Sequence, residues 1–329
     1  MEQIQLFLES CRSKATRETY ELLLQKYVDF VGENHLFTNP NESIIKFIMK
    51  LRNEGKPSTT ISNYMNSIKA FYRINDVTLN IYKIEKLMPE RLKANRDRAY
   101  TRAEIGKMLA IADERMKVVI LLMASSGVRM GAIPDLKIKS LDENKLTVYE
   151  NTKEEYFTFI TPECQNAISE YLEFRKRYGE EITSDSWLLR QQFDLRNPGK
   201  PNKIYHKTMQ GHVRRMMVKS GIRQNGEKYK RQEIMTSHGF RKFFTTQLIN
   251  AKTNSEIREM LLGHKIGLAS AYYRPTPDEM FAEYEKSIDA LTINEENRLK
   301  KKIETLSIEK SRIDRIEEKM SKMEQMYQK

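Results

Sequence analysis

The residue types that could do chemistry concentrate in one stretch of the second half of the chain. This stretch holds two histidines, an arginine and two adjacent tyrosines, which are His238, Arg241, His264, Tyr272 and Tyr273. Guanidinium and imidazole groups bind phosphate oxygens and move protons, and a tyrosine hydroxyl is a nucleophile. Together these side chains predict a site that holds a phosphodiester and attacks it with a hydroxyl group.

Two cations from earlier in the chain complete this set. Arg129 follows the turn at Gly127 that ends an apolar segment, and its planar guanidinium can hold two phosphate oxygens. Lys153 lies at the predicted tip of a β-hairpin between residues 146–150 and 156–160, where an ammonium group can protonate a departing oxygen. Taken singly, each has a common alternative explanation: a surface salt bridge for Arg129 and a solubilising charge for Lys153.

The composition favours a nucleic-acid partner. The 329 residues carry 57 Lys and Arg against 45 Asp and Glu, a net charge of +12, and the pI is near 9.4. We expect DNA in preference to an anionic membrane, because the sequence has no basic amphipathic anchor and no apolar run of membrane-spanning length. The two cysteines are far apart, so we expect no metal site, no cofactor and a cytoplasmic, DNA-associated protein.

Residues 1–90 are predicted to form a helical domain that clamps DNA. Apolar residues recur at helical spacing from Tyr20 to Val31, within residues 43–53, and in a third helix that Ser58 is expected to cap. The opposite face of the third helix carries short polar side chains and cations, which suit contact with phosphates. These are Asn63, Asn66, Ser67, Lys69 and Arg73. An ordinary solvated face explains this pattern equally well.

A basic stretch at residues 91–100 predicts an extended linker between two domains. It lacks apolar periodicity and carries four cations, Arg91, Lys93, Arg96 and Arg98. We expect Arg96 and Arg98 to contact the DNA backbone. A linker that only joins two domains would need flexibility alone.

Residues 101–285 are predicted to form the catalytic domain, of mixed α+β type. A capping box from Thr101 to Glu104 opens its first helix, and a buried helix follows that breaks at Gly127. Residues 196–232 are strongly basic with interleaved aromatic residues, and include a helix that could enter a DNA groove. The DNA-contact candidates in this segment are Lys203, Lys207, Arg214 and Arg215.

In their order along the chain, these motifs resemble the tyrosine recombinases, also called the phage integrase family. The order is arginine, lysine, His-x-x-Arg, histidine and tyrosine, and the resemblance covers residues 1–285. It implies an all-α, SAM-like core-binding domain and a mainly α-helical α+β catalytic domain that close around double-stranded DNA. It also implies site-specific recombination without metal, cofactor or ATP, either to integrate a mobile element or to resolve chromosome dimers. The active form would be a homo-tetramer on DNA, and a monomer or dimer when free.

The resemblance also assigns a role to each residue. Arg129 and Arg241 would clamp the non-bridging oxygens of the scissile phosphate, and His264 would add a hydrogen bond. His238 would help to move the proton of the nucleophile, and Lys153 would protonate the leaving 5′ oxygen. The tyrosine would attack to give a 3′-phosphotyrosyl intermediate.

The nucleophile is expected at Tyr273, nine residues after His264, which is the usual spacing in the family. Tyr272 is the alternative nucleophile and otherwise a packing residue, because the segment before the tyrosines departs from the usual family pattern. A second departure is Ala132, where the family often has an acidic residue three positions after the first arginine. It leaves open how Arg129 is buttressed.

Residues 286–329 are predicted to form a C-terminal helix that ends in a short coiled coil. Apolar residues recur at spacings of three and four, with a slip between Leu306 and Ile313. We expect the coiled coil to promote assembly on DNA, and residues 278–293 to pass to a neighbouring subunit as C-terminal helices of the family do. A solvated helix is the alternative for the tail.

Two other functions fit parts of the pattern. A type IB topoisomerase-like nicking-closing enzyme uses a similar residue set and would relax supercoiled DNA as a monomer. A non-catalytic DNA-binding protein would bind DNA without forming a covalent adduct. The oligomer-suited tail argues against the first function, and the complete set of catalytic residue types argues against the second.

Overall fold

The chain folds into two compact units, Met1–Ala94 and Asn95–Lys329. The computed structural model describes residues 2–90, 97–192, 202–224, 233–267 and 272–327. The division between the units falls inside the basic stretch that the sequence predicts as a linker. In the described part of the chain, no helix has the length and apolar character needed to cross a membrane.

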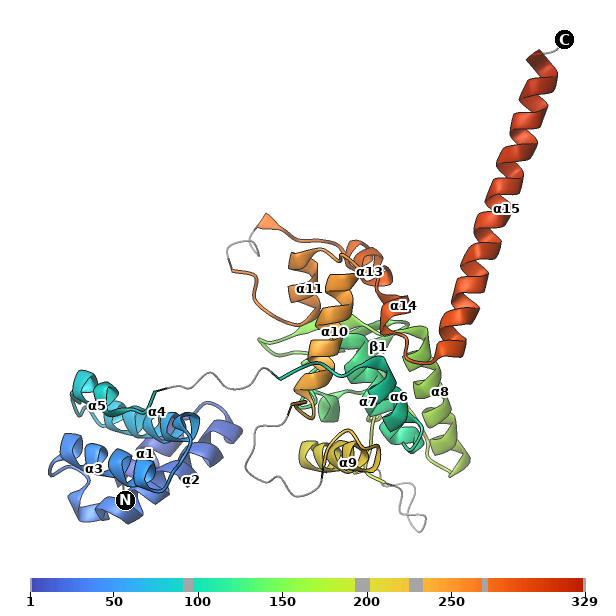
Figure 1. The fold of residues 1–329 in the computed structure, drawn as a ribbon. Helices are drawn as coiled ribbons and strands as arrows, with labels where there is room; N and C mark the ends of the chain where they lie inside the picture. The colour runs from blue at the N-terminus through green and yellow to red at the C-terminus, as the bar shows by residue number, and fades with distance from the viewer. Residues whose placement is uncertain (1, 91–96, 193–201, 225–232, 268–271, 328–329) are drawn as a thin grey trace. The chain divides into compact units, whose positions relative to one another are not determined.

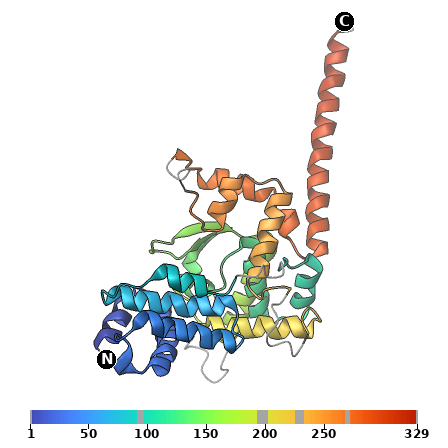
Figure 2. The same ribbon diagram turned by 60° about the vertical axis from the view of Figure 1, so that its left-hand side comes forward.

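The first unit is a bundle of helices (Figures 1 and 2). They are α1 (Glu2–Ser10), α2 (Lys14–Val31), the 3-10 turn η1 (Glu33–His35), α3 (Pro40–Asn53), α4 (Ser58–Ile74) and α5 (Ile81–Leu87). The apolar faces predicted for α2, α3 and α4 form most of the core. Within it the hydroxyls of Tyr27 and Tyr72 lie 3.1 Å apart, and Tyr72 donates to the Leu36 carbonyl at 2.6 Å. These two buried hydroxyls are therefore hydrogen-bonded.

Three details of this unit differ from the sequence prediction. Helix α3 begins three residues earlier than predicted, because Pro40 is well suited to the first turn of a helix. Ser58 is the first helical residue of α4 and not its cap, since Pro57 occupies the cap position. Ser67 is buried and donates to the Tyr64 carbonyl at 2.9 Å. The exposed polar face of α4 is therefore narrower than expected.

The second unit is mainly α-helical and contains a three-stranded antiparallel sheet. Its helices are α6 (Arg102–Leu109), α7 (Glu114–Ser126), α8 (Pro162–Arg177), α9 (His206–Lys219), α10 (His238–Asn250), α11 (Ser255–Leu261), α13 (Pro277–Glu285), α14 (Ile288–Leu291) and α15 (Glu295–Tyr327). After the 3-10 turns η2 (Ile133–Asp135) and η3 (Ile138–Ser140), strands β1 (Leu141–Asp142), β2 (Lys145–Val148) and β3 (Tyr156–Phe159) pair in that order. The two units together confirm the predicted fold class.

Helix α7 is the centre of the core of the second unit (Figure 1). Nearly all its side chains from Met116 to Ser126 are buried, and α6, α8, α9, α10 and α14 contact it. Its sequence is apolar on every side, as expected for a helix surrounded by other elements. The Asp113 side chain accepts a hydrogen bond from the Met116 amide at 2.7 Å and caps the first turn. The helix ends at Ser126, which confirms the predicted break before Gly127.

Residues 97–100, which lie within the predicted linker, belong to the second unit. Tyr100 is 2% exposed and packs in the core. The Arg98 amide donates to the Glu233 carbonyl at 2.9 Å, and its guanidinium donates to the carboxylates of Glu104 and Glu233 at 2.5–2.8 Å. These residues are therefore held by contacts with the rest of the second unit, and the charge of Arg98 already has two carboxylate partners.

Residues 278–293 pack into the core of their own unit, and their exchange with a neighbouring subunit remains a prediction. Tyr284 is fully buried, and its hydroxyl donates to the Ser125 carbonyl at 2.9 Å. The carboxylate of Glu163, in the first turn of α8, accepts hydrogen bonds from the amides of residues 293–294 at 2.7 and 2.8 Å. The core therefore extends past the predicted end of the catalytic domain, up to the start of α15.

Helix α15 is 33 residues long, and Figure 1 shows it as one continuous helix. Its described apolar side chains are 49–65% exposed, and they are Leu299, Ile303, Leu306, Ile313, Ile316 and Met320. A helix is therefore present over the predicted tail, and the coiled coil remains a prediction.

The two cysteines differ sharply in environment. Cys164, in the first turn of α8, is fully buried, and burial raises the pKa of its thiol to about 12. Cys11, in the first unit, is half-buried. A thiol becomes reactive through its thiolate form, so burial makes Cys164 inert.

Candidate active site

Four of the six predicted catalytic residues line one open pocket of about 500 Å³ in the second unit. They are Arg129, His238, Arg241 and His264. The wall also includes Asp97, Ala99, Lys242, Thr245, Thr246, Glu259 and Leu262. The fold thus brings together the ends of α7 and α11 and the start of α10. Within the described ranges, His, Cys, Asp and Glu side chains form no cluster of three that could hold a metal ion.

Backbone carbonyls hold Arg241 in place. This residue, in the first turn of α10, is only 8% exposed. Its Nη1 donates to the Gly127 carbonyl at 2.7 Å, and its Nη2 donates to the Leu262 carbonyl. These carbonyls lie where α7 and α11 end, so Arg241 ties three helices into one frame. The guanidinium is therefore oriented by the fold itself, before any ligand binds.

Two glycines allow this arrangement. Gly127 (φ 63°) ends α7, and a Cβ atom there would lie 2.4 Å from the ring of Phe244. Gly263 (φ 64°) follows α11, and a Cβ atom there would lie 2.6 Å from the ring of Tyr156. Each position combines a left-handed backbone with the close approach of an aromatic ring, so a side chain would cause strain. This explains the glycine in the Ser-Gly-Val-Arg and Leu-Gly-His motifs.

Arg129 brings a second guanidinium to the pocket. It lies two residues beyond Gly127 and is exposed. Burial, and after it the charge of Arg129, lowers the pKa of Arg241. Two guanidinium groups that repel each other favour an anion between them, and a phosphate has suitable geometry and charge. Ala132, at the position where the family often has a carboxylate, is buried in the core, so this turn is supported by packing.

His264 connects Arg241 to a carboxylate. Its Nε2 lies 2.8 Å from Nη2 of Arg241, and its Nδ1 lies 2.6 Å from a carboxylate oxygen of Glu259. A guanidinium has no acceptor atom, so Arg241 donates and Nε2 accepts. The proton of the neutral imidazole is then on Nδ1 and is donated to Glu259. This hydrogen bond is the main cause that lowers the pKa of Glu259.

His238 is the first residue of α10, and it is exposed where it lines the pocket. The positive end of the α10 dipole therefore lies at the pocket, which favours an anion. Sequence reasoning missed Lys242 and Asp97 in the adjacent wall, where the Lys242 ammonium donates to the carbonyl and the carboxylate of Asp97, both at 2.7 Å. Only the position of Lys242 next to Arg241 could have indicated its place.

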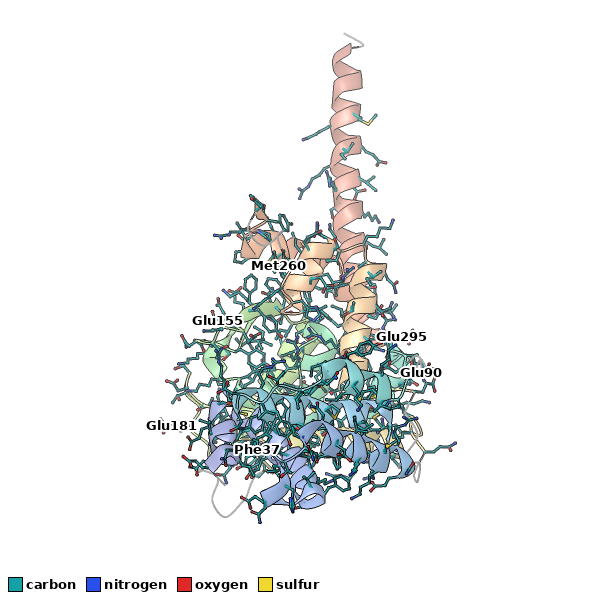
Figure 3. All side chains as sticks on the ribbon, turned by 90° about the vertical axis from the view of Figure 1, so that its left-hand side faces the viewer. Phe37, Glu90, Glu155, Glu181, Met260 and Glu295 are labelled. Carbon is teal, nitrogen blue, oxygen red and sulfur yellow. The ribbon has the colours of Figure 1, made fainter. Side chains whose placement is uncertain are left out.

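Lys153 is not among the described residues that line the pocket. It is exposed in the loop between β2 and β3; Figure 3 labels Glu155, which belongs to the same loop. The Asn151 amide donates to the Glu155 carboxylate at 2.6 Å, and β2 pairs with β3 through Val148 and Tyr156. The hairpin is therefore as predicted, and Lys153 lies at its tip.

The two tyrosines lie in the segment between α11 and α13, and neither is among the described lining residues of the pocket. Tyr272 is 92% exposed and Tyr273 is 37% exposed. The expectation that Tyr272 is a packing residue is therefore wrong, and Tyr273 is the more covered of the two.

The predicted DNA-contact residues divide into exposed and ion-paired side chains. The exposed ones are Arg73 on α4 and Lys207, Arg214 and Arg215 on α9. Lys69 lies 3.0 Å from Glu85, and Lys203 pairs with Asp135. Arg98 pairs with two carboxylates as described above, and Arg96 lies outside the described residues. Exposed ion pairs are weak, so Lys69 and Lys203 can exchange their partners for phosphates.

Helix α9 has the two faces that groove binding requires. One face buries Met209, Val213 and Met217 in the core of the second unit. Lys207 and Arg214, seven residues apart, share the exposed opposite face. This surface remains a predicted DNA contact.

Comparison with known proteins identifies the family. The model described as "Phage integrase family" matches residues 98–279, and that described as "Phage integrase, N-terminal SAM-like domain" matches residues 3–75. This chain belongs to the phage integrase family. It is therefore a tyrosine recombinase, an enzyme of site-specific DNA recombination that cleaves and rejoins DNA strands.

Two curated tyrosine recombinases align with most of this chain. It is 22% identical to the tyrosine recombinase XerA of Thermococcus onnurineus, over 84% of this chain and 90% of that protein. With the XerA of Pyrococcus horikoshii it shares 21% identity, over 87% and 93% of the two chains.

Two solved structures share the fold of the recombinase. One is the Tn1549 transposon integrase with circular intermediate DNA, with a TM-score of 0.58, 19% identity, and coverage of 86% of this chain and 99% of that one. The other is a lambda integrase tetramer bound to a Holliday junction, with a TM-score of 0.60, 15% identity, and coverage of 83% and 75%.

Proposed function

We propose that this recombinase cleaves duplex DNA through a 3′-phosphotyrosine on Tyr273, with the scissile phosphate bound between Arg129 and Arg241. The observation that carries the proposal is the pair of mutually repelling guanidinium groups in one pocket, with two imidazoles beside them. An anionic ligand relieves that repulsion. A phosphodiester is the anion that a DNA recombinase presents to such a site.

The pocket stabilises the charge that develops on the phosphate. Arg241 is already fixed by the carbonyls of Gly127 and Leu262, so little reorganisation is needed when the phosphate enters. Arg129 and His264 reach the same pocket from two other segments. Donors that are aimed in advance at a developing oxyanion commonly supply the largest part of catalysis.

The chemical step exchanges one ester for another. The Tyr273 hydroxyl oxygen attacks phosphorus while the bond from phosphorus to the 5′ oxygen breaks. The phenolic proton passes to His238, and Lys153 gives a proton to the leaving 5′ oxygen. Attack by the 5′-hydroxyl of a partner strand on the phosphotyrosine reverses these transfers and joins the new strand.

Lys153 and Tyr273 must reach the phosphate when DNA is bound, since both side chains are exposed and neither is among the described residues that line the pocket. The hairpin tip and the segment between α11 and α13 are the parts of the catalytic unit that deliver them. Loops commonly complete a catalytic site when substrate binds. Tyr273 is preferred over Tyr272 for its spacing of nine residues from His264.

Assembly of the active form involves α15. Leu299, Leu306, Ile313 and Met320 recur every seven residues and are exposed. Each repeat can also have a second apolar residue. This is Ile303, four residues after Leu299, and Ile316, three residues after Ile313, so only the second apolar position of the repeat shifts. An apolar heptad repeat on an exposed helix is typical of a coiled coil. We assign α15 to contacts between subunits of a homo-tetramer on DNA.

A covalent-trapping experiment tests this function. Duplexes enriched by the protein from a random DNA library are synthesised with a nick near the candidate scissile bond, so that the cleaved strand is lost and religation fails. A denaturant-resistant protein–DNA band is expected, with the DNA attached to Tyr273 in peptide mass spectra. A band attached to Tyr272 would move the nucleophile, and no band despite tight binding would refute catalysis by this pocket.

The same enriched DNA sites distinguish a recombinase from a nicking-closing enzyme. A topoisomerase-like enzyme would relax supercoiled plasmids of any sequence as a monomer. The recombinase is expected to require its site and to give strand exchange between two site-bearing duplexes. Relaxation without a site and without exchange would favour the alternative.

A further inference from the structure

We propose that Glu259 is a positioning residue of the recombinase, which holds His264 in the tautomer and orientation that the phosphate site requires. The proposal rests on the function proposed above. Glu259 touches no reacting atom in this scheme and acts through the imidazole.

The turn at Gly263 joins Glu259 and His264 twice. The His264 amide donates to the Glu259 carbonyl at 2.9 Å, and Nδ1 of the same residue donates to the Glu259 carboxylate at 2.6 Å. The two hydrogen bonds restrain both the backbone and the ring of the histidine. Since Gly263 has φ 64°, this return of the chain depends on the glycine of the Leu-Gly-His motif.

The carboxylate also determines where the imidazole proton lies. Because Glu259 accepts from Nδ1, the Nε2 atom faces Arg241 as an acceptor, 2.8 Å from Nη2. A ring flipped about its axis would present a carbon atom to the guanidinium and lose this contact. When a phosphate replaces His264 as the hydrogen-bond acceptor of Arg241, Nε2 can bind a proton from solvent and donate a hydrogen bond to the phosphate. The adjacent Glu259 carboxylate then stabilises the imidazolium.

A purely structural role for Glu259 is the competing explanation. Its carboxylate also lies 3.5 Å from Arg258, and the side chains of Glu259 and His264 are 36% and 41% exposed. Ion pairs that are this exposed contribute little to folding stability. Removal of the carboxylate is therefore expected to leave the fold intact, so a large loss of cleavage rate would report on the site.

A double-mutant cycle on the full-length protein distinguishes the two roles. Wild type, E259A, H264A and E259A/H264A are compared for the rate of covalent adduct formation on the nicked duplexes, with DNA affinity and thermal midpoint measured in parallel. E259A is expected to slow adduct formation roughly 10- to 100-fold, the usual cost of losing a carboxylate that orients a functional histidine. In the H264A background the same change is expected to have no further effect.

Two further variants sharpen the cycle. E259Q keeps an oxygen that accepts from Nδ1, so it is expected to recover part of the rate, whereas a structural ion pair would not be restored by an amide. E256A is the matched control, because Glu256 lies on the same helix and accepts from the Ser255 hydroxyl; its rate is expected to equal that of wild type.

Equal slowing by E259A with and without His264, or wild-type rates in E259A and E259Q, would overturn the positioning role. If E259A lowers the thermal midpoint, the comparison of E259Q with wild type decides the question. Absence of adduct in the wild type would instead refute the proposed function itself, so the two failures are distinguishable.

Discussion

Arg241 and Lys153 are opposite cases within the same catalytic unit. Arg241 is buried, and its guanidinium is held by two carbonyls and an imidazole from different elements. Lys153 is exposed at a hairpin tip, and the two tyrosines are likewise exposed and are not among the described lining residues of the pocket. In the proposed mechanism the fold alone therefore prepares the guanidinium that stabilises charge, whereas Tyr273, which attacks, and Lys153, which protonates the leaving oxygen, must be brought to the substrate.

The largest loss of covalent adduct formation is expected at Tyr273, which is one of the exposed residues in this comparison. Tyr273→Phe removes the nucleophilic oxygen but keeps the ring, so adduct formation should fall below detection while DNA affinity is unchanged. The readout is the denaturant-resistant band, with Tyr272→Phe as the matched control. If the two variants exchange these phenotypes, Tyr272 is the nucleophile.

A loss of about 1,000-fold in the cleavage rate is expected at Arg241, which the fold holds in place. Arg241→Ala removes a donor aimed at the developing negative charge, and the rate of single-turnover cleavage should fall by about that factor. Arg241→Lys should recover little, because an ammonium group cannot reproduce the planar fork that bonds two carbonyls and a phosphate. Arg177→Ala, at an exposed site on α8, is the control. A rate near wild type in Arg241→Ala would contradict the phosphate clamp.

A smaller loss, about 100-fold, is expected for Lys153→Ala, since it removes a general acid. A substrate with sulfur in place of the leaving 5′ oxygen needs no proton on departure, because a thiolate is stable near neutral pH. Cleavage of this substrate should therefore be nearly equal in wild type and variant. A persistent 100-fold defect on the sulfur substrate would show that Lys153 positions the hairpin and does not act as the acid.

The smallest effect on cleavage is expected from α15. The double variant L306E/I313E places charges on the apolar stripe, and should weaken the assembly of protein on paired sites while single-site cleavage stays within about twofold. The variant S307E/S311E adds the same charge at other exposed positions of the helix. Sedimentation of the DNA complexes measures the difference. Equal assembly by both variants would remove α15 from the tetramer contacts.

Features that depend on local spacing were predictable from the sequence. The break of α7 at Gly127, the hairpin around Lys153 and the placing of His238 and Arg241 in one turn of α10 all follow from short-range patterns. The gathering of Arg129, Arg241 and His264 in one pocket came from the order of motifs in a resembled family. The spacing of these three residues along the chain does not by itself indicate that they meet in one pocket.

Features that depend on which side chains meet in the folded structure were not predictable. Arg98 reads as a cation free to bind DNA, yet a carboxylate from Glu233, 135 residues away, binds it. Ser67 reads as an exposed polar residue, yet it bonds to the preceding turn inside the core. Glu259 carried no signal at all, because its hydrogen bond with His264 depends on a turn that brings the histidine back to it. In each case the partner is visible only in three dimensions.

The contrast between the two thiols has a practical consequence for observing the enzyme at work. Cys164 is sealed in the core with its pKa raised to about 12, so an alkylating dye has no thiolate to attack there. Cys11 in the first unit is half-buried and within reach of solvent. The natural protein, which has two cysteines, should therefore take up one fluorophore per chain without mutagenesis. That single label would report on the N-terminal SAM-like domain without altering any residue of the candidate active site.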